Sequence, residues 1–153
     1  MVHLRQMPKH LRDALVNQEV PTFDTFPWSD GPPLNERRVA LISTAGLHRR
    51  EDPAFTPGAG DYRIIPNNTD MDDLVMSHIS TNFDRTGFFK DINVVFPIDR
   101  LREIANEGEI GSISTRHFSF MGATPPDQME PAARDLASIL KQDSVDAVIF
   151  CPV

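Results

Sequence analysis

The only cysteine of the chain, Cys151, directly follows a short, mostly apolar run at positions 145–150. Such a run predicts a buried strand, and Cys151-Pro152 should end it because proline cannot continue a central ladder. Ligands of open α/β sheets bind beyond the carboxyl ends of the strands. We therefore predict Cys151 to be a catalytic thiol, nucleophilic or redox-active, at that edge. Packing as a small buried hydrophobe is the alternative, since no basic neighbour in the sequence lowers its pKa.

A histidine and a carboxylate, His78 and Asp84, form a second group of catalytic candidates. His78 lies near the end of an apolar run, and Asp84 follows six residues later. A histidine beside a carboxylate can act as an acid–base pair. We expect both residues to face the same crevice as Cys151, because parallel strands end at one edge of a sheet. The pair lacks the spacing of a metal-ligand motif, so no metal site is predicted, and ion pairs on a solvated loop remain the alternative explanation.

Three small residues, Thr44, Ala45 and Gly46, close the first clear strand. Small residues at a strand end let backbone N–H groups approach a ligand, so we predict that these three bind the substrate. An ordinary surface loop is the alternative. The chain has no Walker sequence, no Cys-x-x-Cys pair and no Gly-x-Ser-x-Gly, and Gly58-Ala59-Gly60 has no strand before it. These absences point to no bound nucleotide cofactor, and no cofactor is predicted.

Hydrophobic periodicity outlines the elements that must position these groups. Helices are predicted near residues 4–17, at 97–107 and between 124 and 142. Strands are predicted at 39–44, 62–65, 74–79, 115–120 and 145–150, with a loop from 47 to 60. The alternation of helices and strands predicts an α/β fold. We expect an open, mostly parallel sheet with helices on both faces, a Rossmann-like arrangement of three layers.

The front of the chain has a different character, which divides it into an N-terminal helix and extended arm (1–38) and an α/β domain (39–153). The arm has no hydrophobic period, because prolines interrupt it. Aromatic residues are rarely exposed together in a soluble protein, so we expect the arm to pack across the domain or a neighbouring subunit and the chain to form a homo-oligomer. The residues concerned are Pro21, Phe23, Phe26, Pro27, Trp28, Pro32 and Pro33.

Composition narrows the class of protein. A chain of 153 residues is one domain with a real core, and its net charge of −7 argues against a nucleic-acid or anionic-membrane partner. One cysteine excludes an internal disulfide framework. No secretory signal and no apolar run of about 20 residues is present, so a cytoplasmic location is predicted.

Several segments taken together resemble one family. They are residues 39–46, Ser77-His78 with Asp84, residues 91–101 with 107–111, Ala133-Arg134 and residues 145–148. The sequence Val-Phe-Pro-Ile-Asp-Arg-Leu at 95–101, with Glu-Gly-Glu-Ile-Gly at 107–111, is the most specific part. Over about residues 39–153, the chain is similar to the selenoprotein B family of glycine, sarcosine, betaine and D-proline reductases.

This resemblance implies the reductive cleavage of a small amino acid or amine. In the family a selenocysteine or cysteine attacks the substrate and is later released by thiols, and a partner subunit activates the substrate through a carbonyl group. The reactive residue follows the strand that corresponds to 145–150. We therefore expect it directly after Val153, which would make the chain as given a truncated and inactive form whose complete version contains selenocysteine.

A second function of a different class stays open at this point. The domain could be a non-catalytic ligand-binding or assembly module, using the sheet edge for a ligand and the aromatic arm for a partner. A reading frame that continues past the codon for Val153 would favour the reductase, and its absence would favour the module.

Overall fold

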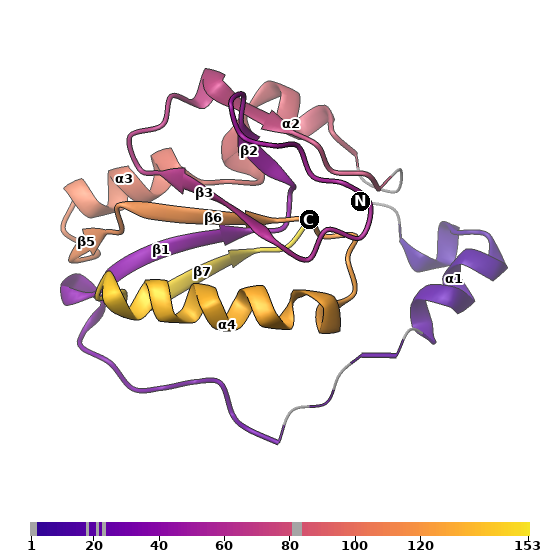
Figure 1. The fold of residues 1–153 in the computed structure, drawn as a ribbon, viewed down its shortest axis with the longest axis horizontal. Helices are drawn as coiled ribbons and strands as arrows, with labels where there is room; N and C mark the ends of the chain where they lie inside the picture. The colour runs from indigo at the N-terminus through magenta and orange to yellow at the C-terminus, as the bar shows by residue number, and fades with distance from the viewer. Residues whose placement is uncertain (1–2, 18, 21, 23, 81–83) are drawn as a thin grey trace.

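A mostly parallel sheet forms the centre of the domain in this computed structural model, which describes all residues except 1–2, 18, 21, 23 and 81–83 (Figure 1). The central strand is β1 (Arg38–Ser43). On one side it pairs in parallel with β5 (Ser112–Ile113) and β6 (Arg116–Phe120), and on the other with β7 (Ala147–Cys151). The outermost strand, β3 (Tyr62–Pro66), is antiparallel to β6. The predicted α/β class with a mostly parallel sheet is confirmed.

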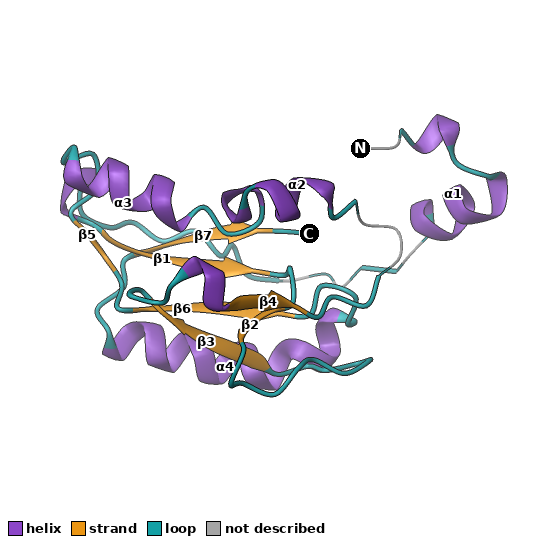
Figure 2. Cartoon of the chain, turned by 90° about the horizontal axis from the view of Figure 1, so that it is seen from above, coloured by secondary structure: helices purple, strands orange, loops and turns teal. Residues whose placement is uncertain are grey.

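Helices cover both faces of this sheet (Figure 2). The long helix α4 (Pro126–Gln142) lies on one face and α3 (Ile98–Asn106) on the other. Successive side chains of β1 pack alternately against the helices on the two faces of the sheet, because side chains alternate across a strand. Leu41 belongs to the apolar cluster that includes Leu101 of α3, and Ile42 to the cluster that includes Leu136 of α4. The predicted three-layer arrangement follows from this alternation.

A small second sheet was not expected from the sequence. It consists of β2 (Leu47–Arg49) and β4 (Leu74–Met76), which pair antiparallel. The prediction of an irregular loop over 47–60 was therefore wrong at its start, because a three-residue strand is too short to show a period. The short helix α2 (Thr86–Lys90) and the 3-10 turns η3 (Met71–Asp73) and η4 (Ile92–Val94) follow nearby. Two further turns, η1 (Leu4–Gln6) and η2 (Leu34–Glu36), lie in the N-terminal arm.

One histidine of the core lies beside β1, between the point where β1 pairs with β5 and the point where it pairs with β6. His117 is fully buried, and its Nδ1 accepts a hydrogen bond of 3.0 Å from the backbone N–H of Leu41. Its Nε2 lies 3.4 Å from Oδ1 of Asn67. Nδ1 must be unprotonated to accept, so the imidazole is neutral with its proton on Nε2. Burial, helped by the charge of Arg102, lowers the pKa of His117 to about 4.

The N-terminal arm extends away from the domain and carries α1 (Lys9–Val16) (Figure 1). Phe26 is 84% exposed and Trp28 is 70% exposed. The expectation that these aromatics pack across the chain's own domain is therefore wrong for these two, and Phe23 lies outside the described residues. Packing across a subunit interface stays a prediction.

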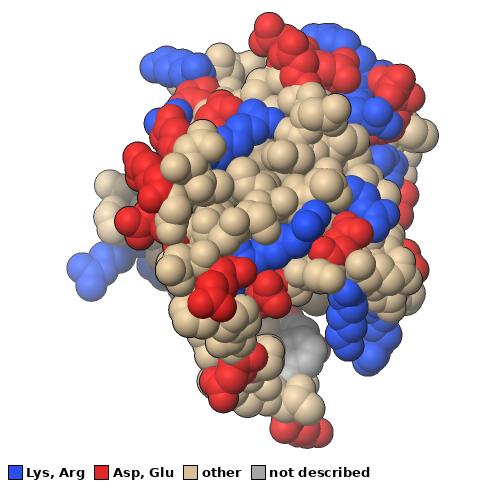
Figure 3. Space-filling model, turned by 90° about the vertical axis from the view of Figure 1, so that its left-hand side faces the viewer, with Lys and Arg blue, Asp and Glu red and all other residues tan. Residues whose placement is uncertain are grey.

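The surface carries charges of both signs. On the face shown in Figure 3, acidic and basic side chains alternate around an uncharged area, without one continuous basic surface. Among the described residues, no helix combines the length and the apolar composition needed to cross a membrane.

Candidate functional site

The carboxyl ends of the three parallel strands β1, β6 and β7 meet at one edge of the sheet. Ser43 and Cys151 are partners in the β1–β7 register, and the N–H of Thr44 donates to the carbonyl of Cys151 at 3.1 Å. The N–H of Gly122, just beyond β6, donates to the carbonyl of Thr44 at 2.8 Å. The structure therefore brings Thr44 and Cys151 together at the edge where α/β sheets bind ligands.

Thr44 holds the segment that follows β7. The N–H of Val153 donates to Oγ1 of Thr44 at 2.8 Å, and that hydroxyl lies 3.4 Å from the carbonyl of Val153, to which it donates. One side chain thus serves both polar groups of a single backbone residue. The direction in which the chain leaves β7 is therefore set by a side chain at the end of the central strand.

Close approach of the strand ends depends on Gly122. A Cβ at this position would lie 2.7 Å from the carbonyl oxygen of Val153 and 2.8 Å from that of Thr44. Both neighbours are backbone atoms, which cannot swing aside. Glycine is therefore the residue type that allows the ends of β1, β6 and β7 to converge.

The N–H groups of the Thr44-Ala45-Gly46 turn are already used inside the protein. Thr44 donates to Cys151 as described, Ala45 donates to Oγ of Ser43 at 3.1 Å, and Gly46 donates to the carbonyl of Phe120 at 2.9 Å. The expectation that these N–H groups approach a ligand is therefore wrong for the structure described here. A substrate-binding role for Thr44, Ala45 and Gly46 stays a prediction, but it must use other atoms.

His78 lies against this turn. Gly46 has φ of +65°, in the left-handed region, and a Cβ there would lie 3.0 Å from the backbone nitrogen of His78. The N–H of Ser77 donates to the carbonyl of Gly46 at 3.0 Å. The backbone of His78 therefore lies beside the turn that follows β1, and the expectation that its side chain faces the same crevice as Cys151 stays a prediction.

The imidazole of His78 is neutral. Its ring is buried, and Nδ1 accepts a hydrogen bond of 3.2 Å from the N–H of Ser80. Burial lowers the pKa of His78, and the positive charge of Arg85 lowers it further. The acceptor role of Nδ1 places the ring proton on Nε2. A neutral imidazole of this kind can act as a general base, whereas donating a proton as a general acid would require the charged imidazolium.

Asp84 has a structural role that the sequence analysis did not anticipate. Its Oδ1 accepts a hydrogen bond of 2.9 Å from the N–H of Thr86, the first residue of α2. This bond to the backbone lowers the pKa of the exposed Asp84 carboxyl. A charged residue that does contact His78 is Arg85, whose guanidinium donates to the His78 carbonyl. A catalytic role for Asp84 stays a prediction.

The thiol of Cys151 is half-buried at the end of β7, and burial raises its pKa. A thiol with a raised pKa is mostly protonated at neutral pH, and the thiolate is the reactive form. Cys151 therefore does not have the electrostatic setting of an activated nucleophile. No group of three or more metal-binding side chains occurs in the part of the chain that the structure describes.

Sequence reasoning missed two residues that build this edge, Ser43 and Gly122. Ser43 is fully buried, and its hydroxyl donates to the carbonyl of Val95 at 2.8 Å while accepting from Ala45. A hydroxyl directly after the apolar run 39–42, within the predicted strand 39–44, was the available signal for Ser43. For Gly122 the signal was a glycine two residues beyond a predicted strand.

Comparison with known proteins identifies the family. A family model described as glycine/sarcosine/betaine reductase selenoprotein B matches residues 13–152. The chain belongs to this selenoprotein B family. The match covers nearly the whole chain, including every strand of the parallel sheet and the edge formed by Thr44, Gly122 and Cys151.

The curated relatives of this member of the selenoprotein B family are named as reductase subunits. It is 36% identical over 121 residues to the D-proline reductase subunit gamma of Acetoanaerobium sticklandii, covering 76% of this chain and 49% of the relative. It is 30% identical over 143 residues to the glycine reductase complex component B subunit gamma of Symbiobacterium thermophilum, covering 86% of this chain and 32% of the relative. The matched region is therefore half or less of each of these relatives. No solved structure matches.

Proposed function

We propose that this chain is part of a reductase subunit that uses a selenol or thiol to cleave the C–N bond of a small amino acid or amine. The substrate would be of the glycine, sarcosine, betaine or D-proline type. The observation that carries the proposal is the convergence of β1, β6 and β7 at one edge, where Thr44 holds the backbone of Val153. The names of the relatives, all reductase subunits, support the same class of reaction.

The proposed reaction follows a balanced sequence of bonds. A selenolate or thiolate attacks the carbon that carries the nitrogen, and the electron pair of the C–N bond leaves with the nitrogen. An ammonium or quaternary ammonium group leaves as a neutral amine, and an uncharged amine takes up a proton as it leaves. A thiol then attacks the selenium or sulfur, and the carbon takes a proton. This leaves a selenenylsulfide or disulfide, which an external dithiol reduces. The overall reaction consumes two thiol equivalents for each C–N bond cleaved.

Two residues of this chain have proposed parts in the reaction. His78 is neutral, so its imidazole can accept the proton of the attacking thiol. Thr44 positions the backbone after β7, where the proposed reactive residue follows Val153. Activation of the substrate through a carbonyl group on a partner subunit belongs to the same proposal.

The test begins with the DNA downstream of the codon for Val153. We expect an in-frame selenocysteine-compatible stop codon or a cysteine codon, followed by a cysteine-containing loop and a helix. The complete protein, made with selenocysteine and with its partner subunit, should consume D-proline, glycine, sarcosine or betaine in a dithiol-dependent way. A different stop codon with no continuing frame would remove the truncation hypothesis. If the selenocysteine-containing protein turned over none of the four substrates, the proposal of a reductase would be overturned.

A non-catalytic module remains the second candidate, and two observations favour it. The pKa of Cys151 is raised, and the N–H donors of the 44–46 turn are occupied by protein groups. The downstream reading frame and the turnover assay separate the two functions, because the module predicts neither a reactive residue after Val153 nor dithiol oxidation.

A further inference from the structure

We propose that a groove between β4 and α2 binds the acidic, aromatic segment 24–30 of the N-terminal arm of a second copy of this chain. The groove lies outside the candidate site at the ends of β1, β6 and β7. The proposal therefore concerns assembly and does not depend on the proposed reaction.

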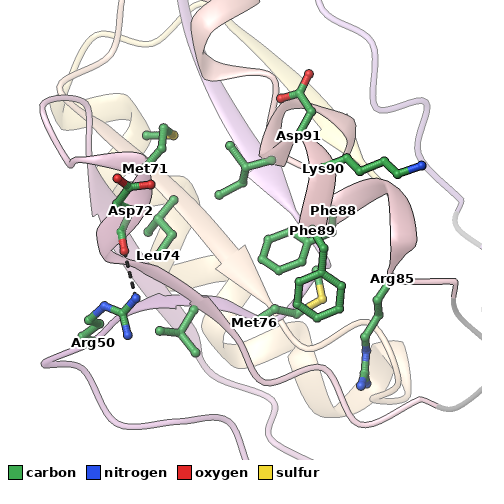
Figure 4. Close-up of a pocket in the computed structure, with 12 residues that line it drawn as sticks. Arg50, Met71, Asp72, Leu74, Met76, Arg85, Phe88, Phe89, Lys90 and Asp91 are labelled. Atoms are coloured by element: carbon green, nitrogen blue, oxygen red, sulfur yellow. Dashed lines mark hydrogen bonds between the residues drawn. The ribbon is translucent and has the colours of Figure 1, made fainter.

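The groove has a volume of about 520 Å³ and lies between two walls (Figure 4). The β4 strand and the preceding turn η3 form one wall, and α2 and η4 form the other. Pockets of 300–1,000 Å³ hold ligands as large as a pair of aromatic side chains. The apolar side chains that line it are Met71, Leu74, Val75, Met76, Phe88, Phe89 and Ile92.

The rim of the groove carries an excess of positive charge. Three cations, Arg50, Arg85 and Lys90, line it together with two carboxylates, Asp72 and Asp91, which gives a local formal charge of about +1. The whole chain has a net charge of −7. The positive rim therefore favours an occupant that is apolar and acidic.

Segment 24–30 of the arm has this combination of properties. Its sequence is Asp-Thr-Phe-Pro-Trp-Ser-Asp, with two carboxylates and no lysine or arginine. Phe26 and Trp28 are both largely exposed in the single chain. Aromatic side chains of this size are strong contributors to interfaces because each buries about 150–250 Å². The segment therefore complements both the apolar lining and the positive rim of the groove.

Segment 24–30 of the chain's own arm does not line its own groove. In Figure 1 the stretch of arm before η2 passes below α4, whereas α2 lies at the top of the view, beyond the strands of the sheet. The arm joins the domain at η2, where the carbonyl of Arg37 accepts from the N–H of Ser112 at the amino end of β5. A second copy can present its arm to this groove without any rearrangement of the domain. Reciprocal exchange of the arms gives a twofold dimer with two equal contacts.

The first experiment measures self-association of the 153-residue chain by sedimentation equilibrium. Phe89 lines the groove and is 77% exposed in the single chain. We expect Phe89→Ala and Trp28→Ala each to raise the dimer dissociation constant about tenfold or more. The matched control is Phe150→Ala, because Phe150 is an equally exposed phenylalanine on β7 outside the groove. A monomeric wild-type chain, or an equal effect of Phe150→Ala, would overturn the proposal.

The second experiment identifies the occupant of the groove. Trp28 is the only tryptophan, so its emission should shift to shorter wavelength as the chain concentration rises. A photoreactive benzoylphenylalanine in place of Trp28 should cross-link to residues 85–92. In an equimolar mixture of isotopically heavy and light chains, the proposal predicts cross-links that join heavy to light copies. Cross-links confined to single copies, or directed to another surface or another protein, would overturn it.

Discussion

The side chain of Thr44 and the backbone of Val153 form a two-point contact between the central strand and the chain after β7. The N–H of Val153 donates to Oγ1 of Thr44 at 2.8 Å, and the same hydroxyl donates to the carbonyl of Val153 at 3.4 Å. These two residues are 109 positions apart in the sequence. The central strand thus fixes the path of the backbone beyond Cys151. The reactive residue proposed to follow Val153 would need such a fixed backbone in order to be oriented toward a substrate.

Replacing Thr44 by valine should release this contact. The valine side chain has nearly the same shape but leaves the N–H of Val153 without its acceptor, so we expect the free energy of unfolding to fall by about 1 kcal/mol. Amide hydrogen exchange at Val153 should become faster. Thr44→Ser keeps the hydroxyl and is the control. Unchanged exchange at Val153 in the valine variant would show that the contact does not hold the segment in solution.

Replacing Gly122 by alanine should be more damaging than a typical surface substitution. The new Cβ would press on the carbonyl oxygens of Val153 and Thr44, so we expect a loss of about 2 kcal/mol in the free energy of unfolding, measured with urea.

The matched control is Gly87→Ala. A Cβ there lies in helix α2 and meets the exposed side chain of Val94, with the nearest methyl at 3.3 Å and solvent beside it, so the change should stay within about 1 kcal/mol. Equal losses in the two variants would mean that the strand ends do not approach as closely in solution as they do here.

The layers of the fold could be predicted because its long elements have clear periods. The apolar run at 39–42, the helical faces of 98–106 and 126–142 and the run at 147–150 lie where their patterns place them. The direction of β3 could not be predicted, because side-chain alternation is the same in parallel and antiparallel strands. β2 and α2 were missed because three and five residues are too few to establish a period.

Lowering the pH should destabilise the protein through His117. The unfolded histidine takes up a proton below its ordinary pKa of 6.5, whereas the folded one resists protonation until about pH 4. The stability that this residue contributes is therefore complete above pH 6.5 and is lost as the pH falls towards 4. The loss from this group should be about 1.4 kcal/mol per pH unit, or about 3 kcal/mol in total.

The measurement is the free energy of unfolding of wild type and His117→Gln between pH 7 and pH 4. The glutamine oxygen can still accept from the N–H of Leu41 but does not titrate in this range. We expect a smaller fall in stability for the glutamine variant. Identical pH profiles would show that His117 is not kept neutral by the core.

The candidate site could be predicted only in part. The rule that parallel strands end at one edge placed Thr44 and Cys151 together, and the contact of Gly46 with His78 added the histidine. The assignment of Asp84 missed a local effect, because an aspartate side chain readily accepts a hydrogen bond from the backbone N–H two residues further on, in an Asx turn. The use of the turn's own N–H groups could not be predicted, since their acceptors come from β6 and β7, more than 70 residues away, and from Ser43.

Alkylation of Cys151 should be slow in the folded chain. Burial raises the pKa of its thiol above the ordinary value of 9.0, so the fraction of thiolate at pH 7–8 is smaller than for a free cysteine. We expect the iodoacetamide reaction to be slower in native protein than in urea-unfolded protein, and its pH profile to be displaced upward. Cys151 is the only cysteine, so the label reports on this residue alone. A native rate above the unfolded rate would indicate an activated thiol and would return Cys151 to the position of nucleophile.

The 153-residue chain by itself should not reduce glycine, sarcosine, betaine or D-proline with a dithiol donor. The proposed reactive residue lies beyond Val153, and the thiol present, Cys151, has a raised pKa and is half-buried. The assay should follow substrate loss and dithiol oxidation together, with wild type compared to Cys151→Ser and with the partner subunit present and absent. Turnover that disappears in Cys151→Ser would make this thiol the nucleophile. Turnover that survives the substitution would place the reactive group elsewhere in residues 1–153 and would contradict the proposed position after Val153.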